Sequence, residues 1–206
     1  MNPWYNDLAE RLLLNGQWEC SLDDKIGTLN VPGTWEAHGF PRRVDGPASL
    51  RKIIFVPQEW RGKRIHLQFE AVSFSAEVPV NGIKAGGHIG MWTPFALDVT
   101  DTILPGQNNE IGLTVYKPGE HFPMRQSLAG FLPDVAIPFG GIWQSTQLIA
   151  IDGPSLSDIA VLSDVHSSSV RVKAQVHQAA GLTAVIRLLA PNGHEITISQ
   201  SLVKAD

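Results

Sequence analysis

Two stretches decide the fold class: Ile65-His66-Leu67-Gln68-Phe69-Glu70 and Ile111-Gly112-Leu113-Thr114-Val115. In both, apolar residues alternate with polar or small ones, which is the pattern of a strand with one buried and one solvent-facing side. Similar short segments recur along the chain, separated by turns drawn from 19 glycines and 14 prolines. This punctuation is typical of an antiparallel sandwich or barrel, so we predict an all-β protein.

The same criteria place individual strands and turns. The expected strands are 50–56, 64–70, 76–80, 95–99, 110–116, 143–151, 159–165, 170–177, 184–189 and 195–203, with a further strand beginning at Gln17. Asn81-Gly82 and Asn192-Gly193 predict hairpin turns, since both central residues of a type I′ turn need positive φ. Pro79 cannot donate a ladder hydrogen bond, so its strand should be an edge strand or carry a bulge.

The first residues and the last quarter of the chain differ from this pattern. Trp4, Leu8 and Leu12 would share one face of a helix, so a short helix or an irregular arm is expected there. A domain boundary is predicted at Asp152-Gly153-Pro154, because all six tryptophans precede it and no aromatic Trp, Phe or Tyr follows. We therefore expect domains over 1–152 and 153–206. The second has about four strands, so we expect the chain to end inside it.

Composition excludes several classes of protein. The 206 residues carry a net charge of -4, and Lys and Arg form no stripe, which argues against a nucleic-acid partner. No stretch approaches the ~20 apolar residues of a membrane span. The single cysteine, Cys20, excludes an internal disulfide and is interpreted as a buried strand residue. The sequence shows no signal peptide, and localisation stays open between the cytoplasm and, if a signal was removed, the periplasm or the exterior.

A set of short motifs resembles one known family. Leu14-Asn15-Gly16-Gln17-Trp18 and Val31-Pro32-Gly33-Thr34-Trp35-Glu36 open the set. The motifs that follow are Phe69-Glu70-Ala71-Val72, Val80-Asn81-Gly82, His88-Ile89-Gly90-Met91-Trp92-Thr93-Pro94-Phe95, Asp98-Val99-Thr100 and Gly141-Ile142-Trp143-Gln144. In order and spacing over residues 14–150, they resemble the N-terminal sugar-binding module of family 2 glycoside hydrolases, the group of β-galactosidases, β-glucuronidases and β-mannosidases.

The resemblance implies a galactose-binding-like jelly-roll sandwich over 1–152 and the truncated start of an immunoglobulin-like β-sandwich over 153–206. It implies a parent enzyme that hydrolyses O-glycosidic bonds with two glutamates in a (β/α)8 barrel. Retaining glycosidases need two carboxylates about 5–5.5 Å apart, and a barrel takes about 250 residues. We therefore expect no catalytic residue here and a fragment that is inactive alone. The glutamates interpreted instead as solvated surface carboxylates are Glu36, Glu59, Glu70, Glu77, Glu110 and Glu120.

In some relatives, a loop of this module reaches the active site and contributes an acidic residue. The corresponding loop here, 117–140, has little strand pattern and contains four prolines; long loops of this kind are often functional. We expect Asp134, Arg125, His121 and Trp143 to lie near the substrate of the complete enzyme. Loop capping or domain docking is the alternative role for Asp134. For the tryptophans of the family motifs, packing in the core or against the barrel is favoured over an open stacking platform.

No metal site or cofactor is expected, because the histidines are scattered and Cys20 has no nearby partner. The expected partners are a β-galactoside- or β-glucuronide-like carbohydrate in the full-length enzyme and the catalytic barrel of the same polypeptide. The unpaired strand edges of a partial sandwich favour a homodimer. Two alternatives stay open, a stand-alone lectin-like module and a purely structural docking domain, because a fold does not fix a function.

Overall fold

The computed structural model describes residues 4–5, 9–122, 138–178 and 180–201. In these residues the regular elements are strands and two short 3-10 helices, and the strands pair antiparallel throughout. The predicted all-β class is confirmed. No helix in the described part of the chain is both long and apolar enough to cross a membrane. The chain divides into a first unit, Ala9–Ile151, and a second unit, Asn2–Leu8 with Asp152–Asp206.

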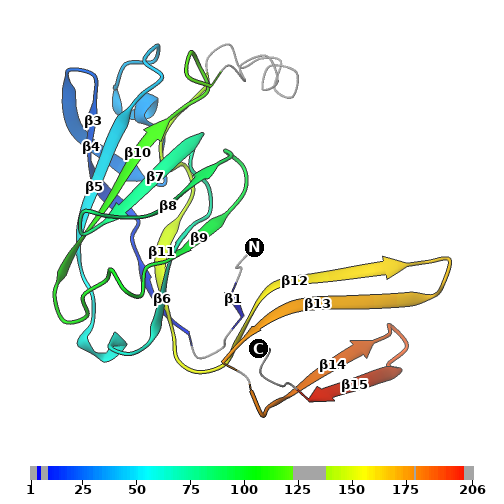
Figure 1. Cartoon of the computed structure of the whole chain (residues 1–206). Helices are drawn as coiled ribbons and strands as arrows, with labels where there is room; N and C mark the ends of the chain where they lie inside the picture. Colours follow the sequence, from blue (N-terminus) through cyan, green and yellow to red (C-terminus); the bar gives the residue numbers. More distant parts are fainter. Residues whose placement is uncertain (1–3, 6–8, 123–137, 179, 202–206) are drawn as a thin grey trace. The chain divides into compact units, whose positions relative to one another are not determined.

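The first unit contains two sheets that face each other (Figure 1). The larger has the order β4-β3-β5-β10-β7-β8, formed by β4 (Lys25–Val31), β3 (Gly16–Leu22), β5 (Ala48–Phe55), β10 (Asn108–Tyr116), β7 (Ser75–Val80) and β8 (Ile83–Ile89). The smaller has the order β2-β11-β6-β9, formed by β2 (Glu10–Leu13), β11 (Thr146–Ile151), β6 (Arg64–Phe69) and β9 (Phe95–Asp98). The 3-10 helices are η1 (Trp35–His38) and η2 (Gln58–Trp60).

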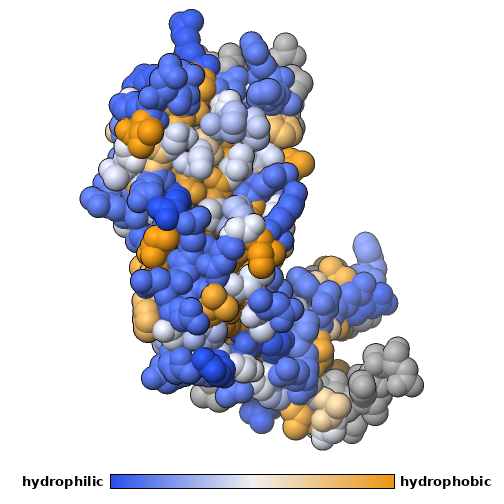
Figure 2. All heavy atoms as spheres, turned by 60° about the vertical axis from the view of Figure 1, so that its left-hand side comes forward, coloured by the Kyte–Doolittle hydropathy of each residue, from blue (hydrophilic) through white to orange (hydrophobic). Residues whose placement is uncertain are grey.

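The core of the first unit forms between these sheets because every second residue of a strand points to the same face. Trp18 and Leu50 from the larger sheet and Leu67 and Phe69 from the smaller one are all at most 1% exposed. Cys20 is buried in the same cluster, as predicted, and burial raises the pKa of its thiol to about 11. On the face drawn in Figure 2, apolar residues form separate small patches among hydrophilic ones.

One expectation about β6 is wrong. The alternation predicted a wet outer face, yet His66 is 4% exposed and Gln68 is fully buried. The reason is that β6 lies between β11 and β9, so neighbouring side chains cover its outward residues. Gln68 exchanges hydrogen bonds there with Glu70 (2.7 Å) and Gln147 (3.3 Å), which satisfies its amide.

The turn predictions hold to different degrees. Asn81 and Gly82 both have positive φ, at 50° and 78°, and join β7 to β8 as a tight hairpin. β7 is an inner strand, but the β7–β8 register shifts between Val78 and Pro79, which is the predicted bulge. Between β14 and β15, by contrast, the loop spans 190–194 and only Gly193 of the Asn192-Gly193 pair has positive φ.

Of the short helix or irregular arm expected at the start of the chain, the helix is wrong for the residues that are described. Trp4 lies in the short strand β1 (Trp4–Tyr5), and Leu12 lies in β2, while Leu8 falls outside the described residues. β2 pairs with β11 in the register Leu12 to Leu148. Three apolar residues at helical spacing are a weak signal, and the edge of a sheet offers hydrogen-bond partners along one side of the backbone.

The second unit consists of β-hairpins. β1, β12 (Ser155–Asp164) and β13 (Ser169–His177) form a three-stranded sheet, and β14 (Thr183–Leu189) pairs with β15 (Glu195–Ser201). In the second hairpin Ile186 pairs with Ile198 and Leu188 with Ile196, so one face is apolar. Ile196 and Ile198 are nevertheless 50% and 54% exposed.

Candidate functional site at the base of loop 117–140

Of the four residues expected near the substrate, two lie among the described residues. Asp134 and Arg125 lie outside the described residues, whereas His121 and Trp143 lie just before and just after that segment. His121 is exposed and packs edge-on against Tyr116, with ring centroids 5.1 Å apart. Trp143 is partly buried, and its indole nitrogen donates a hydrogen bond of 2.8 Å to the carbonyl of Met91. The structure therefore describes the two ends of the predicted loop.

The beginning of the loop is held by the segment before β5. The backbone N–H of Lys117 donates to the carbonyl of Asp45 at 3.0 Å, and the N–H of Glu120 donates to the Asp45 carboxylate at the same distance. A Cβ atom at Gly119 would lie 1.7 Å from that carboxylate, so only glycine allows the chain to approach it this closely. These contacts hold residues 117–120 against the segment that leads into β5.

The end of the loop is held between two other segments of the first unit. The hydroxyl of Ser73 donates to the carbonyl of Phe139 at 2.6 Å, and the N–H of Trp35 donates to the carbonyl of Gly140 at 2.9 Å. A Cβ atom on Gly140 would lie 2.2 Å from the Trp35 ring. The glycine therefore lets the backbone lie directly on the indole.

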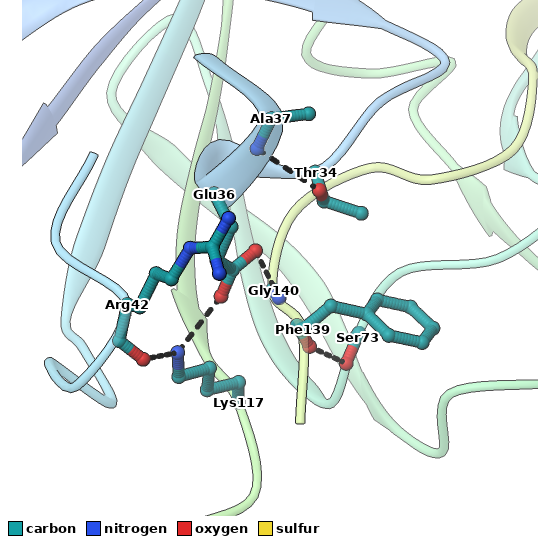
Figure 3. Close-up of polar contacts among 8 residues, drawn as sticks. All are labelled: Thr34, Glu36, Ala37, Arg42, Ser73, Lys117, Phe139 and Gly140. Atoms are coloured by element: carbon teal, nitrogen blue, oxygen red, sulfur yellow. Dashed lines mark hydrogen bonds and ion pairs between the residues drawn. The ribbon is translucent and has the colours of Figure 1, made fainter. Parts of the chain in front are cut away.

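One carboxylate, that of Glu36, joins both ends of the loop (Figure 3). Its Oε1 accepts from Lys117 Nζ at 2.8 Å, and its Oε2 accepts from the backbone N–H of Gly140 at 3.2 Å. Lys117 Nζ also donates to the carbonyl of Arg42 at 2.6 Å and lies 5.3 Å from the centroid of the Trp35 ring. We call this arrangement of Glu36, Lys117 and Gly140 the loop clamp.

The ion pair of the loop clamp is buried. The Lys117 side chain is 0% exposed and that of Glu36 is 13% exposed. The interpretation of Glu36 as a solvated surface carboxylate is therefore wrong. η1 aims this side chain inward, and the hydroxyl of Thr34 caps the turn by accepting from the N–H of Ala37 at 3.4 Å. A buried charge is tolerated only when it is paired and hydrogen-bonded, as both charges are here.

Three aromatic side chains pack edge to face beside the end of the loop. The ring centroids of Trp92 and Trp143 are 4.9 Å apart, and Phe139 lies 6.1 Å from Trp92 and 5.6 Å from Trp143. Trp92 is 46% exposed. Trp35, in contrast, is fully buried in the core, as favoured from the sequence. The edge-on packing leaves part of the Trp92 surface available to a ligand or to another domain.

Two carboxylates of the described residues at this end of the first unit hold the backbone or a buried lysine. Glu36 is bound in the loop clamp, and the Asp45 carboxylate accepts from the backbone of Glu120. On the outer face of the larger sheet, Arg51 donates to Glu19 at 2.9 Å and to Glu110 at 2.6 Å. Among the described residues, no group of three or more His, Cys, Asp or Glu side chains could hold a metal ion.

Sandwich and loop together define the chain as an all-β module with a long loop held at both ends. No family model matches the chain. Curated proteins do match: it is 25% identical to a β-glucuronidase of Bacteroides fragilis over 92% of its own length and 29% of that protein. It is 30% identical to a putative β-glucuronidase of Formosa agariphila over 77% of its length and 21% of that protein. It is also 31% identical to a β-galactosidase of Thermoanaerobacter pseudethanolicus, covering 58% of the chain and 16% of that protein.

Solved structures agree with these matches in fold. The β-glucuronidase of Ruminococcus gnavus in complex with D-glucuronic acid superposes with a TM-score of 0.71 at 20% identity. The superposition covers 98% of this chain and 40% of that one. The resemblance to family 2 glycoside hydrolases is thereby confirmed as a partial match: the chain is similar to a portion of their β-glucuronidases and β-galactosidases. It spans between a sixth and two fifths of the length of these proteins.

Proposed function

We propose that this chain is a non-catalytic, sugar-binding-type accessory module of a family 2 glycoside hydrolase. The observation that carries the proposal is the asymmetry of the match, which takes in 92% of this chain but 29% of the Bacteroides fragilis β-glucuronidase. The catalytic glutamates of the parent enzyme then lie in a (β/α)8 barrel elsewhere in the longer polypeptide. Its substrate is a β-glucuronide or a β-galactoside, the two sugars named for the relatives.

The two parts of the chain then have different folds. Residues 1–152 form a galactose-binding-like jelly roll, which is supported by two antiparallel sheets packed on one core. Residues 153–206 form the beginning of an immunoglobulin-like sandwich, which is supported by antiparallel hairpins, one of them with an apolar face. The module positions the barrel and contributes one wall of its active site.

The loop 117–140 is the part of the module that reaches the substrate in this proposal. His121, Arg125, Asp134 and Trp143 would then act on the sugar, with the carboxylate and guanidinium binding hydroxyl or carboxylate groups. The loop clamp supports this role, because a binding loop needs ends fixed by a rigid scaffold. A buried ion pair that closes the base of a long loop is costly to maintain, and a mere connection would not require it.

The reading frame of the gene beyond Asp206 tests the proposal. We expect it to continue through the second sandwich into a (β/α)8 barrel with two glutamates at strand ends. A stop codon directly after Asp206 would overturn the accessory role. Calorimetric titration of the chain with methyl β-D-glucuronide and methyl β-D-galactoside separates the alternatives: saturable millimolar binding excludes a purely structural domain, and flat titrations exclude a lectin.

A further inference from the structure

A second polar site lies on the outer face of the larger sheet and shares no residue with the loop clamp. It is a groove of about 440 Å³ between β3, β5 and β10 on one side and the segment 44–47 on the other. Small-molecule sites in proteins have volumes of about 300–1,000 Å³, so the groove is large enough for a sugar.

The floor of the groove is a row of three hydroxyl groups. Ser21 pairs with Ser49 across β3 and β5, and Ser49 pairs with Thr114 across β5 and β10. Their chain neighbours on each strand are buried in the core, so these three side chains point outward. Neighbouring strands lie about 4.8 Å apart, so the hydroxyls form a ladder perpendicular to the strands.

These hydroxyl groups have free hydrogen-bonding capacity. Within the described part of the chain, no side-chain hydrogen bond engages Ser21, Ser49, Thr114 or the Asp23 carboxylate at the end of the row. The next row along the same strands is different, because there Arg51 is bound to both Glu19 and Glu110. On this sheet face, a row of paired charged side chains therefore lies beside a row of hydroxyl groups that can still bind a ligand.

The walls of the groove add apolar surface and one charge. Val44 and Pro47 present aliphatic surface to the same space, and Asp23 is the charged side chain among the described residues that line it. A hydroxyl group both donates and accepts, whereas a carboxylate only accepts. The combination suits a ligand with many hydroxyl groups and a C–H face. It disfavours an anion, because like charges repel.

We propose that this groove is a second carbohydrate-binding site, selective for neutral sugars over uronic acids. The choice of a carbohydrate rests on the proposed function, while the location and the charge preference rest on the groove itself. Hydroxyl groups of the sugar form hydrogen bonds with Ser21, Ser49 and Thr114. Two further sugar hydroxyls donate to the Asp23 carboxylate, and the C–H face of the sugar packs on Val44 and Pro47. The segment 44–47 also contacts the beginning of the loop, through the carboxylate of Asp45.

The test is a titration of the 15N-labelled chain with methyl β-D-galactoside and, separately, with methyl β-D-glucuronide, followed by two-dimensional NMR. We expect the galactoside to shift amides around residues 21–23, 44–49 and 114, with a dissociation constant in the millimolar range. The glucuronide should bind there several-fold more weakly. Ser49→Ala, which removes the central hydroxyl without breaking a contact, should weaken binding roughly fivefold.

Two further variants sharpen the result. Asp23→Asn should remove the preference for the neutral sugar, while Thr28→Val, on the same sheet but outside the groove, should leave binding unchanged. The absence of groove shifts at saturating galactoside would overturn the inference, as would shifts that Ser49→Ala does not reduce. Shifts confined to His121 and Trp143 would also overturn the second site but leave the accessory function intact, so the two failures are distinguishable.

Discussion

The two units of the chain contain the same kind of strand in different surroundings. In the first unit, Leu67 in β6 is fully buried, because a second sheet covers the inner face of its own sheet. In the second unit, Ile198 in β15 lies on an equally regular apolar face but remains 54% exposed. Alternation along a strand therefore predicts that a strand forms and which side is apolar. Whether that apolar side is buried depends on a second sheet that covers it, and the alternation does not predict that sheet.

The largest expected effect concerns the loop clamp in the first unit. Lys117→Met leaves Glu36 without its partner in a site where the carboxylate is only 13% exposed. Removing one partner of a buried ion pair costs about 3–5 kcal/mol, so we expect a loss of about 4 kcal/mol in the free energy of unfolding. Urea denaturation followed by tryptophan fluorescence measures this change.

The matched control is the exposed pair of Lys84 and Glu77, whose side chains are 68% and 63% exposed. Lys84→Met should change the stability by less than about 0.5 kcal/mol. The double variant Lys117→Met with Glu36→Leu should recover part of the loss, because it leaves no unpaired charge. Equal effects of Lys117→Met and Lys84→Met would show that the loop clamp contributes no more than a surface pair.

The next effect compares the two units directly. Leu67→Ala removes a fully buried side chain and should cost about 3 kcal/mol. Ile198→Ala removes a half-exposed one and should cost less than about 1 kcal/mol in the second unit. Thermal unfolding of both variants checks the difference, and similar losses would mean that the apolar face of β15 is covered after all.

A smaller effect is expected at the end of the loop. Gly140→Ala would force a methyl group into the Trp35 ring, and overpacking of this kind costs about 2 kcal/mol. Gly27→Ala is the control, because its nearest neighbour is the tip of Phe40 at 3.3 Å and its φ is not positive. The same denaturation assay applies, and a tolerated Gly140→Ala would argue against a backbone held on the indole.

The smallest effect depends on pH. His88 stacks on Phe95 with ring centroids 4.4 Å apart, and burial lowers its pKa below the ordinary value of 6.5. The unfolded chain therefore binds this proton more readily than the folded one. The free energy of unfolding should fall as the pH decreases from 7 through 6.5, and His88→Gln should reduce that slope. An unchanged slope would assign the dependence to other groups.

The fold of the first unit was largely predictable, because its evidence lies in local patterns. Asn81-Gly82 and Pro79 specified a turn and a bulge through their own backbone preferences. The outer face of β6 was not predictable in this way: His66 and Gln68 look solvent-facing until the order of the strands is known. The strand at the start of the chain was missed for the same reason.

The candidate site was predictable in place but not in detail. The long loop marked the region, yet the loop clamp depends on contacts between residues 81 and 104 positions apart. A partial signal did exist: Lys117 continues the inward series of Ile111, Leu113 and Val115 by two residues. Nothing in the local sequence around Glu36 indicates its partner, because tertiary packing brings the two together.

In the proposed function, this chain is a non-catalytic module of a glycoside hydrolase. The most direct measurement is release of p-nitrophenol from p-nitrophenyl β-D-glucuronide and p-nitrophenyl β-D-galactoside by the purified 206-residue chain. We predict a rate equal to that of buffer at every substrate concentration. Saturable turnover that co-purifies with the chain would contradict the claim and would require a catalytic carboxylate pair within these residues.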